Sequence, residues 1–209
     1  MNMPSECHAP SRTFPQQDGL SGAGLVPDKI LDWESLLRRR EEWRNEGAVV
    51  VWTNGCFDLM HAGHVRSLRS ARRLGDILVV GLNSDASVRV NKGPTRPIMC
   101  QDERAEMLAG FECVDAVVIF EETTPETALG RLQPEIHCKG ADYAPPHGKP
   151  VPEARIVEAY GGQVRYLPLL PGISTTELVA RIERLGSDPP SRSSYGGQAA
   201  LAPPADTTR

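Results

Sequence analysis

Five short apolar runs recur along the chain, with polar segments between them. The first three runs are rich in β-branched residues and almost continuously apolar. Such runs are typical of strands that are buried on both faces, as in a parallel sheet. The pattern therefore predicts five strands, at residues 48–52, 76–82, 115–120, 135–139 and 163–169.

Segments with helical periodicity lie between these strands. Gly75 ends one of them, and Ser174 with Glu177 forms a capping box at the start of another. Strands and helices that alternate in this way predict an α/β fold with a Rossmann-like, doubly wound parallel sheet of five strands and helices on both faces. The expected helices are 28–46, 64–75, 102–111, 124–132, 152–162 and 174–186.

Composition divides the chain into a folded unit and two terminal segments. Residues 1–27 and 187–209 are rich in proline, glycine and serine, and hold too little apolar surface to offset the entropy of ordering. We interpret both as disordered tails. The folded domain is then 28–186, with an N-terminal helix at 28–46 and the catalytic core at 48–186.

The overall charge and apolar content narrow the class of protein. The 209 residues carry a net charge of −4, which argues against a general nucleic-acid or membrane-surface binder. No apolar stretch reaches the ~18 residues of a membrane span, and the N-terminus lacks a signal-peptide pattern. Five cysteines are scattered without a paired spacing: Cys7, Cys56, Cys100, Cys113 and Cys138. We expect reduced thiols, a cytoplasmic location, and no nucleic-acid or membrane partner.

Residues with catalytic potential gather in the segments that follow the predicted strands. In open α/β sheets, ligands bind outside the carboxyl ends of the strands. The segment 83–97, interpreted as a loop, carries Lys92 and Arg96, and Lys139 ends the fourth strand. Two helix N-termini, near residues 63 and 175, should point to the same edge and favour anions. This arrangement predicts a phosphate site.

Two histidines lie three residues apart in the stretch VWTNGCFDLMHAGHV. His61 should lie just before a helix and His64 in its first turn, so that both imidazoles can donate to one phosphate. Gly55 and Gly63 would allow a close approach of the backbone to a nucleotide. Two other interpretations remain open, namely a zinc site shared with Cys56 and a simple packing role.

The ordered motifs NGCFD, HAGHV, KGPTRP, KGADY and GISTT resemble those of the nucleotidyltransferase superfamily with an HxGH signature, the cytidylyltransferase-like proteins. Within it, residues about 48–183 are most similar to the D-glycero-β-D-manno-heptose 1-phosphate adenylyltransferases, which make ADP-heptose. The resemblance implies that AMP passes from ATP to the sugar 1-phosphate with release of pyrophosphate. We expect Mg²⁺ as cofactor with ATP, and we assign it no protein ligand, because phosphate and water can supply its ligands.

The resemblance also implies roles for individual residues. His61, His64 and Lys92 would be catalytic, acting on the charge of the triphosphate. The nucleotide would be bound by residues of the first strand, its loop and the last helix: Thr53, Gly55, Phe57, Gly63, Ser174, Thr175 and Thr176. The sugar phosphate would be bound by Asp58, Lys139, Asp142 and Tyr143. Arg104 matches a family arginine, although its helix could equally use it structurally.

Partners and alternatives complete the expectation. Besides ATP and a sugar 1-phosphate, we expect a homo-oligomer and a separate sugar kinase, because only a tail and one helix precede the core. A first alternative is a cytidylyltransferase acting on glycerol 3-phosphate or another small phosphorylated acceptor. Glycerol 3-phosphate enzymes carry an arginine before GIST, whereas this chain reads LPLLPGISTT. A second alternative is a non-catalytic nucleotide-binding protein.

Overall fold

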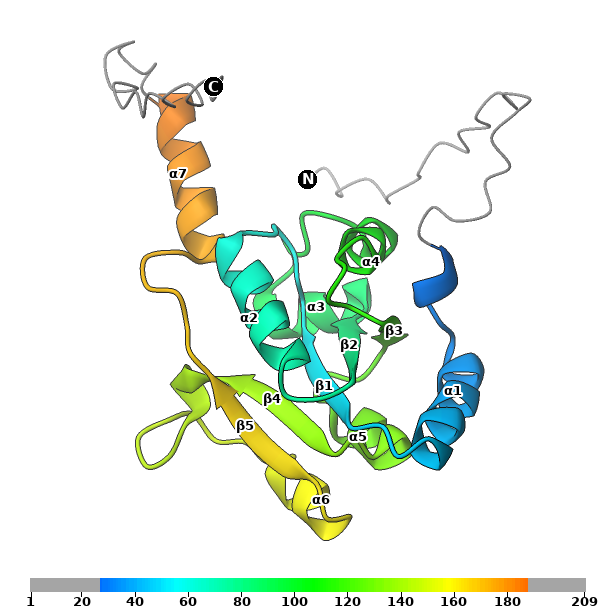
Figure 1. Ribbon diagram of the computed structural model, residues 1–209. Helices are drawn as coiled ribbons and strands as arrows, with labels where there is room; N and C mark the ends of the chain where they lie inside the picture. Colours follow the sequence, from blue (N-terminus) through cyan, green and yellow to red (C-terminus); the bar gives the residue numbers. More distant parts are fainter. Residues whose placement is uncertain (1–26, 188–209) are drawn as a thin grey trace, which may run out of the picture.

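The computed structural model describes residues 27–187 (Figure 1). Apart from Pro27 and Ser187, the two predicted tails, 1–27 and 187–209, lie outside these residues. In chain order the elements are η1 (Pro27–Lys29), α1 (Trp33–Asn45), β1 (Val50–Gly55), α2 (Ala62–Arg72), β2 (Ile77–Asn83), α3 (Asp85–Lys92), α4 (Gln101–Ala109), β3 (Ala116–Phe120), α5 (Glu126–Leu132), β4 (Ile136–Gly140), η2 (Ala141–Tyr143), α6 (Ala154–Ala159), β5 (Gln163–Leu167) and α7 (Thr175–Ser187).

The sheet is parallel, with strand order β3-β2-β1-β4-β5. The chain first moves outward from β1 to β3 and then returns to place β4 on the other side of β1. Thr53 at the centre of β1 thus pairs with Val80 of β2 and with Cys138 of β4. The order of the strands reverses between β1 and β4, which is the place where doubly wound sheets bind ligands. The predicted fold class is confirmed.

Helices cover both faces of this sheet, because alternate strand residues point to opposite sides. On one face, Val51 and Val80 pack with Leu68 of α2 and Leu108 of α4. On the other face, buried strand residues pack against α1, α5 and α6. The strand residues are Val50, Trp52 and Val79, and the helix residues are Leu36, Trp43, Leu129, Leu132 and Val157. The sheet is therefore the middle of three layers, and its carboxyl edge is left for the loops.

A close approach within the sheet depends on a glycine. The Trp52 indole is fully buried and lies over Gly81 of β2, where an added Cβ would come within 2.1 Å of Trp52 Cζ2. Any side chain at this position would have to displace the ring. Gly81 therefore fixes how tightly β1 and β2, the two strands that lead into the site, can pack.

The segment 83–97 differs from the expected loop. It contains α3, whose N-cap Ser84 accepts a 3.2 Å hydrogen bond from the Ser87 N–H. The helix has eight residues, and the turn-forming NSD and KGP stretches that flank it favoured a loop. Lys92 is consequently the last residue of a helix, with Gly93 at φ 98° behind it.

The last helix, α7, extends away from the sheet layers (Figure 1). Its outer turns expose Ile182 and Leu185. Within residues 27–187, none of the helices combines the length and the apolar character needed to cross a membrane.

Candidate active site

His61 and His64 lie together at the start of α2. His61 is the N-cap residue, with extended backbone, and the His64 N–H donates to the His61 carbonyl at 2.9 Å. The two imidazole rings stack, with centroids 3.8 Å apart and an interplanar angle of 17°. The predicted placement, one histidine before the helix and one in its first turn, is confirmed.

Each histidine has a ring nitrogen without a hydrogen-bond partner among the described residues. The Nδ1 atoms of both rings are buried and have no hydrogen-bond partner among the described residues. Burial lowers the pKa of His61, and burial together with the neighbouring His61 lowers the pKa of His64 to about 4. A buried polar atom without a partner costs about 1–3 kcal/mol. Two such atoms lie side by side at a helix N-terminus, which indicates a ligand-binding site. A ligand bound there would contact neutral imidazoles.

The N-terminus of α7 adjoins the same loop. The Thr175 hydroxyl lies 3.4 Å from the Leu59 carbonyl, two residues before His61. Gly63, in the first turn of α2, faces the segment before α7, because a Cβ there would be 2.9 Å from His61 Nδ1 and 3.9 Å from the Ile173 carbonyl. Two positive helix ends therefore meet at the histidines, as expected for a phosphate site.

The loop that leads out of β1 brings an aromatic ring to the histidines. Phe57 has a φ of 45°, an uncommon backbone conformation for an aromatic residue. This conformation places its ring against Gly55, where a Cβ would approach the ring to 3.2 Å, and 5.4 Å from the His64 ring. Thr53 is buried, and its hydroxyl lies 3.5 Å from the Cys138 carbonyl of β4.

Asp58, expected to bind the sugar phosphate, is hydrogen-bonded within the protein. Its Oδ2 accepts a 2.7 Å hydrogen bond from Arg96 Nη1, and its Oδ1 accepts from the Ile98 and Met99 N–H groups at 2.8 and 3.1 Å. The carboxylate is buried and occupied by these donors. Asp58 thus anchors the segment after α3 to the β1 loop and holds Arg96 beside it.

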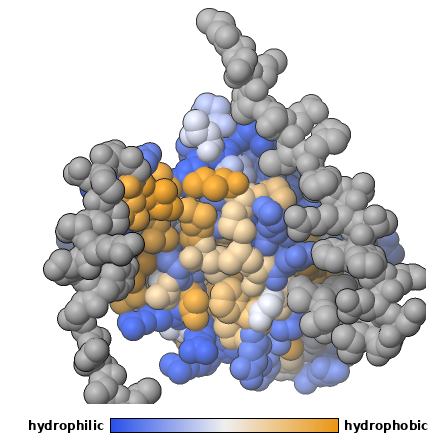
Figure 2. Space-filling view, turned by 90° about the horizontal axis from the view of Figure 1, so that it is seen from above, coloured by the Kyte–Doolittle hydropathy of each residue, from blue (hydrophilic) through white to orange (hydrophobic). Residues whose placement is uncertain are grey.

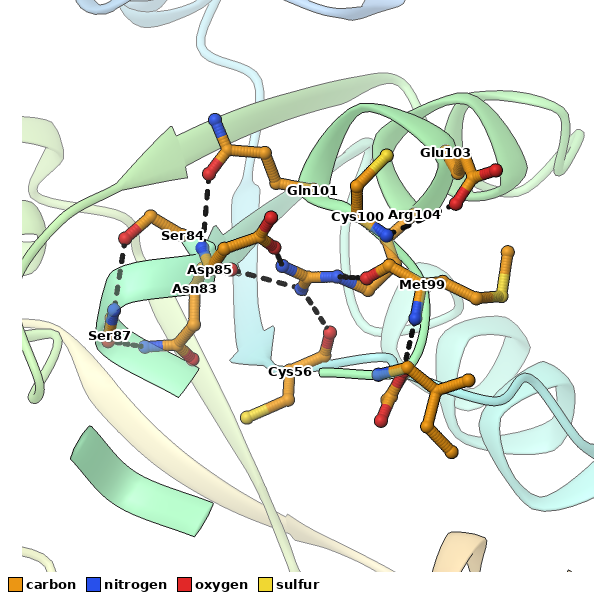
Figure 3. Close-up of polar contacts among 12 residues, drawn as sticks. Cys56, Asn83, Ser84, Asp85, Ser87, Met99, Cys100, Gln101, Glu103 and Arg104 are labelled. Carbon is orange, nitrogen blue, oxygen red and sulfur yellow. Dashed lines mark hydrogen bonds and ion pairs between the residues drawn. The ribbon is translucent and has the colours of Figure 1, made fainter. Parts of the chain in front are cut away.

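Arg104 joins the ends of the first two strands from inside the protein (Figure 3). The side chain is fully buried on α4. It donates to the Cys56, Asn83 and Met99 carbonyls and to Asp85 Oδ1, the last at 2.6 Å. Of the two roles left open for Arg104, the structure shows the structural one: it fixes the backbone just before Phe57.

Lys92 acts on the same loop through its charge. Burial raises the pKa of the Cys56 thiol, while the positive charges of Lys92 and Arg104 act to lower it. Lys92 itself is exposed at the end of α3.

Across residues 27–187, no three histidine, cysteine or carboxylate side chains lie close enough together to hold a metal ion, so Cys56 does not complete a zinc site with the histidines.

A second group of charged residues lies at the end of β4. The Lys139 ammonium forms a 2.7 Å ion pair with Glu153 and stands 4.8 Å above the Tyr143 ring. Lys149 Nζ lies 5.2 Å from the centroid of the same ring and 2.7 Å from Asp142 Oδ2. Three of the four residues expected to bind the sugar phosphate, Lys139, Asp142 and Tyr143, thus lie together at the end of β4.

The remaining predicted residues lie at the start of α7. Ser174 Oγ accepts a 3.1 Å hydrogen bond from the Glu177 N–H and so caps the helix. Thr176 is exposed in the first turn.

Seen from above, this side of the molecule carries hydrophobic residues gathered among hydrophilic ones (Figure 2). Ile98 and Ile173, from the two segments that flank the histidine loop, both have exposed side chains.

The family of the chain follows from comparison with known proteins. The family model described as cytidylyltransferase-like matches residues 52–181, which is more than half of the chain and includes both histidines. The chain belongs to the cytidylyltransferase-like family. The motifs HAGHV, KGADY and GISTT all lie within the matched residues.

Curated relatives of this cytidylyltransferase-like chain carry the name bifunctional protein HldE. That of Syntrophotalea carbinolica is 48% identical over 77% of this chain and 37% of its own length. That of Trichlorobacter lovleyi is 50% identical over 74% of this chain and 31% of its own length. The chain thus spans about a third of the length of these relatives. A solved lipopolysaccharide core biosynthesis protein from Thermoplasma volcanium is 26% identical, with a TM-score of 0.48, over 59% of this chain and 98% of that one.

Sequence reasoning missed Glu153, which forms an ion pair with Lys139, one of the predicted site residues of this cytidylyltransferase-like chain. Glu153 lies at the N-cap of α6, is only 2% exposed, and contacts both Lys139 and His137 of β4. The single signal in the sequence is an acidic residue at the start of a helix that packs beside β5. That signal is weak, because such residues usually interact with the helix dipole at the surface.

Proposed function

We propose that this protein is an adenylyltransferase that transfers AMP from ATP to D-glycero-β-D-manno-heptose 1-phosphate, giving ADP-heptose and pyrophosphate. The observation that carries the proposal is the stacked pair of His61 and His64, with unpartnered nitrogen atoms at the N-terminus of α2. The identity of about half to the HldE proteins over three quarters of the chain supports the choice of sugar, together with the motif resemblance.

The reaction needs no covalent enzyme intermediate. A phosphate oxygen of the sugar 1-phosphate attacks the α-phosphorus of ATP, and the bond from that phosphorus to the pyrophosphate oxygen breaks in line with the attack. The acceptor is already ionised, so no base is required. Catalysis then consists of positioning two anions and stabilising the five-coordinate phosphorus.

The two imidazoles would act on the oxygens of the α-phosphate. In their neutral form each still has one N–H donor, and donation strengthens as negative charge builds on the non-bridging oxygens. The first N–H groups of α2 point in the same direction. Lys92 and the start of α7, with Ser174, Thr175 and Thr176, would balance the charge of the β- and γ-phosphates as pyrophosphate leaves.

ATP would enter as its magnesium complex, and the ion would neutralise part of the negative charge of the triphosphate. We assign no protein ligand to this ion. The nucleoside would lie against the β1 loop, where the ring of Phe57 packs on Gly55. Exposed apolar side chains at this edge, such as Ile98 and Ile173, suit the faces of a nucleobase.

The acceptor would bind at the end of β4, the neighbour of β1 in the sheet. Lys139 and Tyr143 would contact its phosphate and sugar ring. Because the acceptor is a sugar 1-phosphate, a sugar kinase acting earlier must supply phosphorylated heptose. We further propose that the reaction takes place in the cytoplasm, where ATP is available, and that ADP-heptose serves the synthesis of lipopolysaccharide.

The test is pyrophosphate release by the full chain with Mg²⁺. ATP and CTP are each combined with heptose 1-phosphate, with hexose 1-phosphates and with glycerol 3-phosphate. Release with ATP and the heptose phosphate alone is the expected result. Release with CTP and glycerol 3-phosphate would move the protein to the cytidylyl alternative. ATP binding without release in any combination would indicate a non-catalytic nucleotide-binding protein.

A further inference from the structure

We infer that Glu153 is a positioning residue for the transfer reaction, and that it holds the ammonium group of Lys139 where the phosphate of the acceptor binds. The inference rests on the proposed function and adds to it a residue that none of the motifs contains. Glu153 lies in the segment between KGADY and GISTT, in the first turn that leads into α6.

The contacts show what Glu153 holds. Its Oε1 accepts a 2.7 Å hydrogen bond from Lys139 Nζ and lies 3.4 Å from His137 Nε2. The Glu153 side chain is 3% exposed, whereas that of Lys139 is 14% exposed. The carboxylate is therefore inside the protein, while the ammonium group lies at the boundary with solvent. Glu153 therefore holds the Lys139 ammonium group from the interior of the protein.

The ionised state of Glu153 depends on these two partners. Burial by itself raises the pKa of the carboxyl, but the hydrogen bonds from His137 and Lys139 outweigh it and lower the pKa to about 2. Burial lowers the pKa of His137, so its imidazole is neutral near pH 7 and serves as a hydrogen-bond donor. The cluster thus contains one negative and one positive charge, with His137 fixing the orientation of the acid.

Stability alone gives little reason for such a pair. A buried ion pair is often no better for folding than apolar residues of similar volume, because desolvation offsets the attraction. The pair does restrict a lysine, whose free side chain has about 2 kcal/mol of rotamer entropy. Glu153 removes much of that freedom in the folded protein, before any ligand binds.

Lys139 retains capacity for a ligand in this position. An ammonium group has three donors, and Glu153 takes one of them. The ring of Tyr143 lies 4.8 Å away and defines a second side of the group. A phosphate oxygen can take a remaining donor without breaking the ion pair. The phosphate of the acceptor therefore binds to a lysine that is already ordered. Binding then costs less side-chain entropy.

The experiment is a double-mutant cycle on the full chain with Glu153→Gln, Lys139→Met and the double variant. Glutamine keeps the shape of the side chain and removes its charge. If Glu153 acts through Lys139, the KM for heptose 1-phosphate rises about tenfold in Glu153→Gln, while the KM for ATP stays within about twofold. The same substitution then adds nothing in the Lys139→Met background. Glu158→Gln removes an exposed charge from the same helix and is the matched control.

The outcomes separate positioning from folding and from the proposed function. Equal effects of Glu153→Gln in both backgrounds, or an unchanged KM for the acceptor, would overturn the inference. If the wild type releases no pyrophosphate, the proposed function fails, and calorimetric binding of the same sugar phosphate replaces the kinetic readout. Weaker binding in Glu153→Gln that is absent in the Lys139→Met background would then support the inference. Unchanged binding, or none by the wild type, would reject it.

Discussion

The His61 ring lies nearly parallel to the His64 ring at a centroid distance of 3.8 Å. Two imidazolium ions at this separation would repel each other, and the proximity of His61 is one reason why the pKa of His64 falls to about 4. The pair therefore meets its ligand uncharged near pH 7. A bound triphosphate would reverse this balance, because negative charge beside an imidazole raises its pKa.

Removing either imidazole should reduce turnover far more than nucleotide binding. We expect His61→Ala and His64→Ala each to lower kcat for pyrophosphate release by about 10²–10³-fold, the usual cost of one donor to a developing oxyanion. The dissociation constant for ATP, measured by calorimetry, should change little. His147→Ala removes an exposed histidine from the loop after η2 and should leave both quantities unchanged. Equal losses in kcat and ATP affinity would instead indicate a ground-state binding role.

The buried neutral state of His64 should make folding sensitive to acid. Above about pH 6.5 the imidazole is neutral in both folded and unfolded chains, so it contributes no pH dependence. As the pH falls from 6.5 towards 4, the unfolded chain gains a proton that the folded chain resists, and the free energy of unfolding decreases. Replacing His64 by glutamine should remove this part of the decrease.

Urea unfolding of wild type and His64→Gln at pH 7, 5.5 and 4.5 measures that difference. The two curves should differ in slope by less than the limit of about 1.4 kcal/mol per pH unit for one proton, because His64 is partly exposed to water. Titrating groups that do not contact His64, such as Glu153, are present in both proteins and cancel in the comparison. Parallel curves would mean that His64 titrates normally.

A methyl group at position 63 should displace the catalytic ring. The Cβ of an alanine there would lie 2.9 Å from His61 Nδ1, so the ring has to move by a few tenths of an ångström or more. We expect Gly63→Ala to lower kcat about tenfold to a hundredfold with little change in melting temperature. Gly130→Ala is the matched control, since nothing lies within 4 Å of its Cβ in α5. It should be neutral or slightly stabilising and fully active.

The fold could be predicted from the sequence because its strands are buried on both faces. The runs that became β1, β2 and β3 are almost continuously apolar, and this pattern is particular to a covered parallel sheet. The two histidines could be placed as well, because their position depends only on where β1 ends and α2 begins. Local sequence determines both points.

The contacts that decide individual roles could not be predicted in the same way. Asp58 meets Arg96, and Glu153 meets Lys139, across separations of 38 and 14 residues. No periodicity records such pairs, because they arise from how loops return to the sheet edge. Helix α3 was missed for another reason: with eight residues, it is too short for its apolar spacing to outweigh the turn-forming residues around it.

Removing the buried charge of Arg104 should strongly reduce the free energy of unfolding. Arg104→Met would leave Asp85 and the carbonyls of Cys56, Asn83 and Met99 without their buried donor. Breaking a buried, hydrogen-bonded ion pair costs about 3–5 kcal/mol, so we expect a loss of that order in the free energy of unfolding. Arg89→Met removes an exposed arginine from α3 and should change stability by no more than about 0.5 kcal/mol. Urea unfolding followed by circular dichroism measures both variants.

Because Arg104 also fixes the backbone before Phe57, the folded fraction of Arg104→Met should bind ATP more weakly than the wild type. Wild-type affinity with reduced stability would show that the network supports the fold without shaping the nucleotide loop.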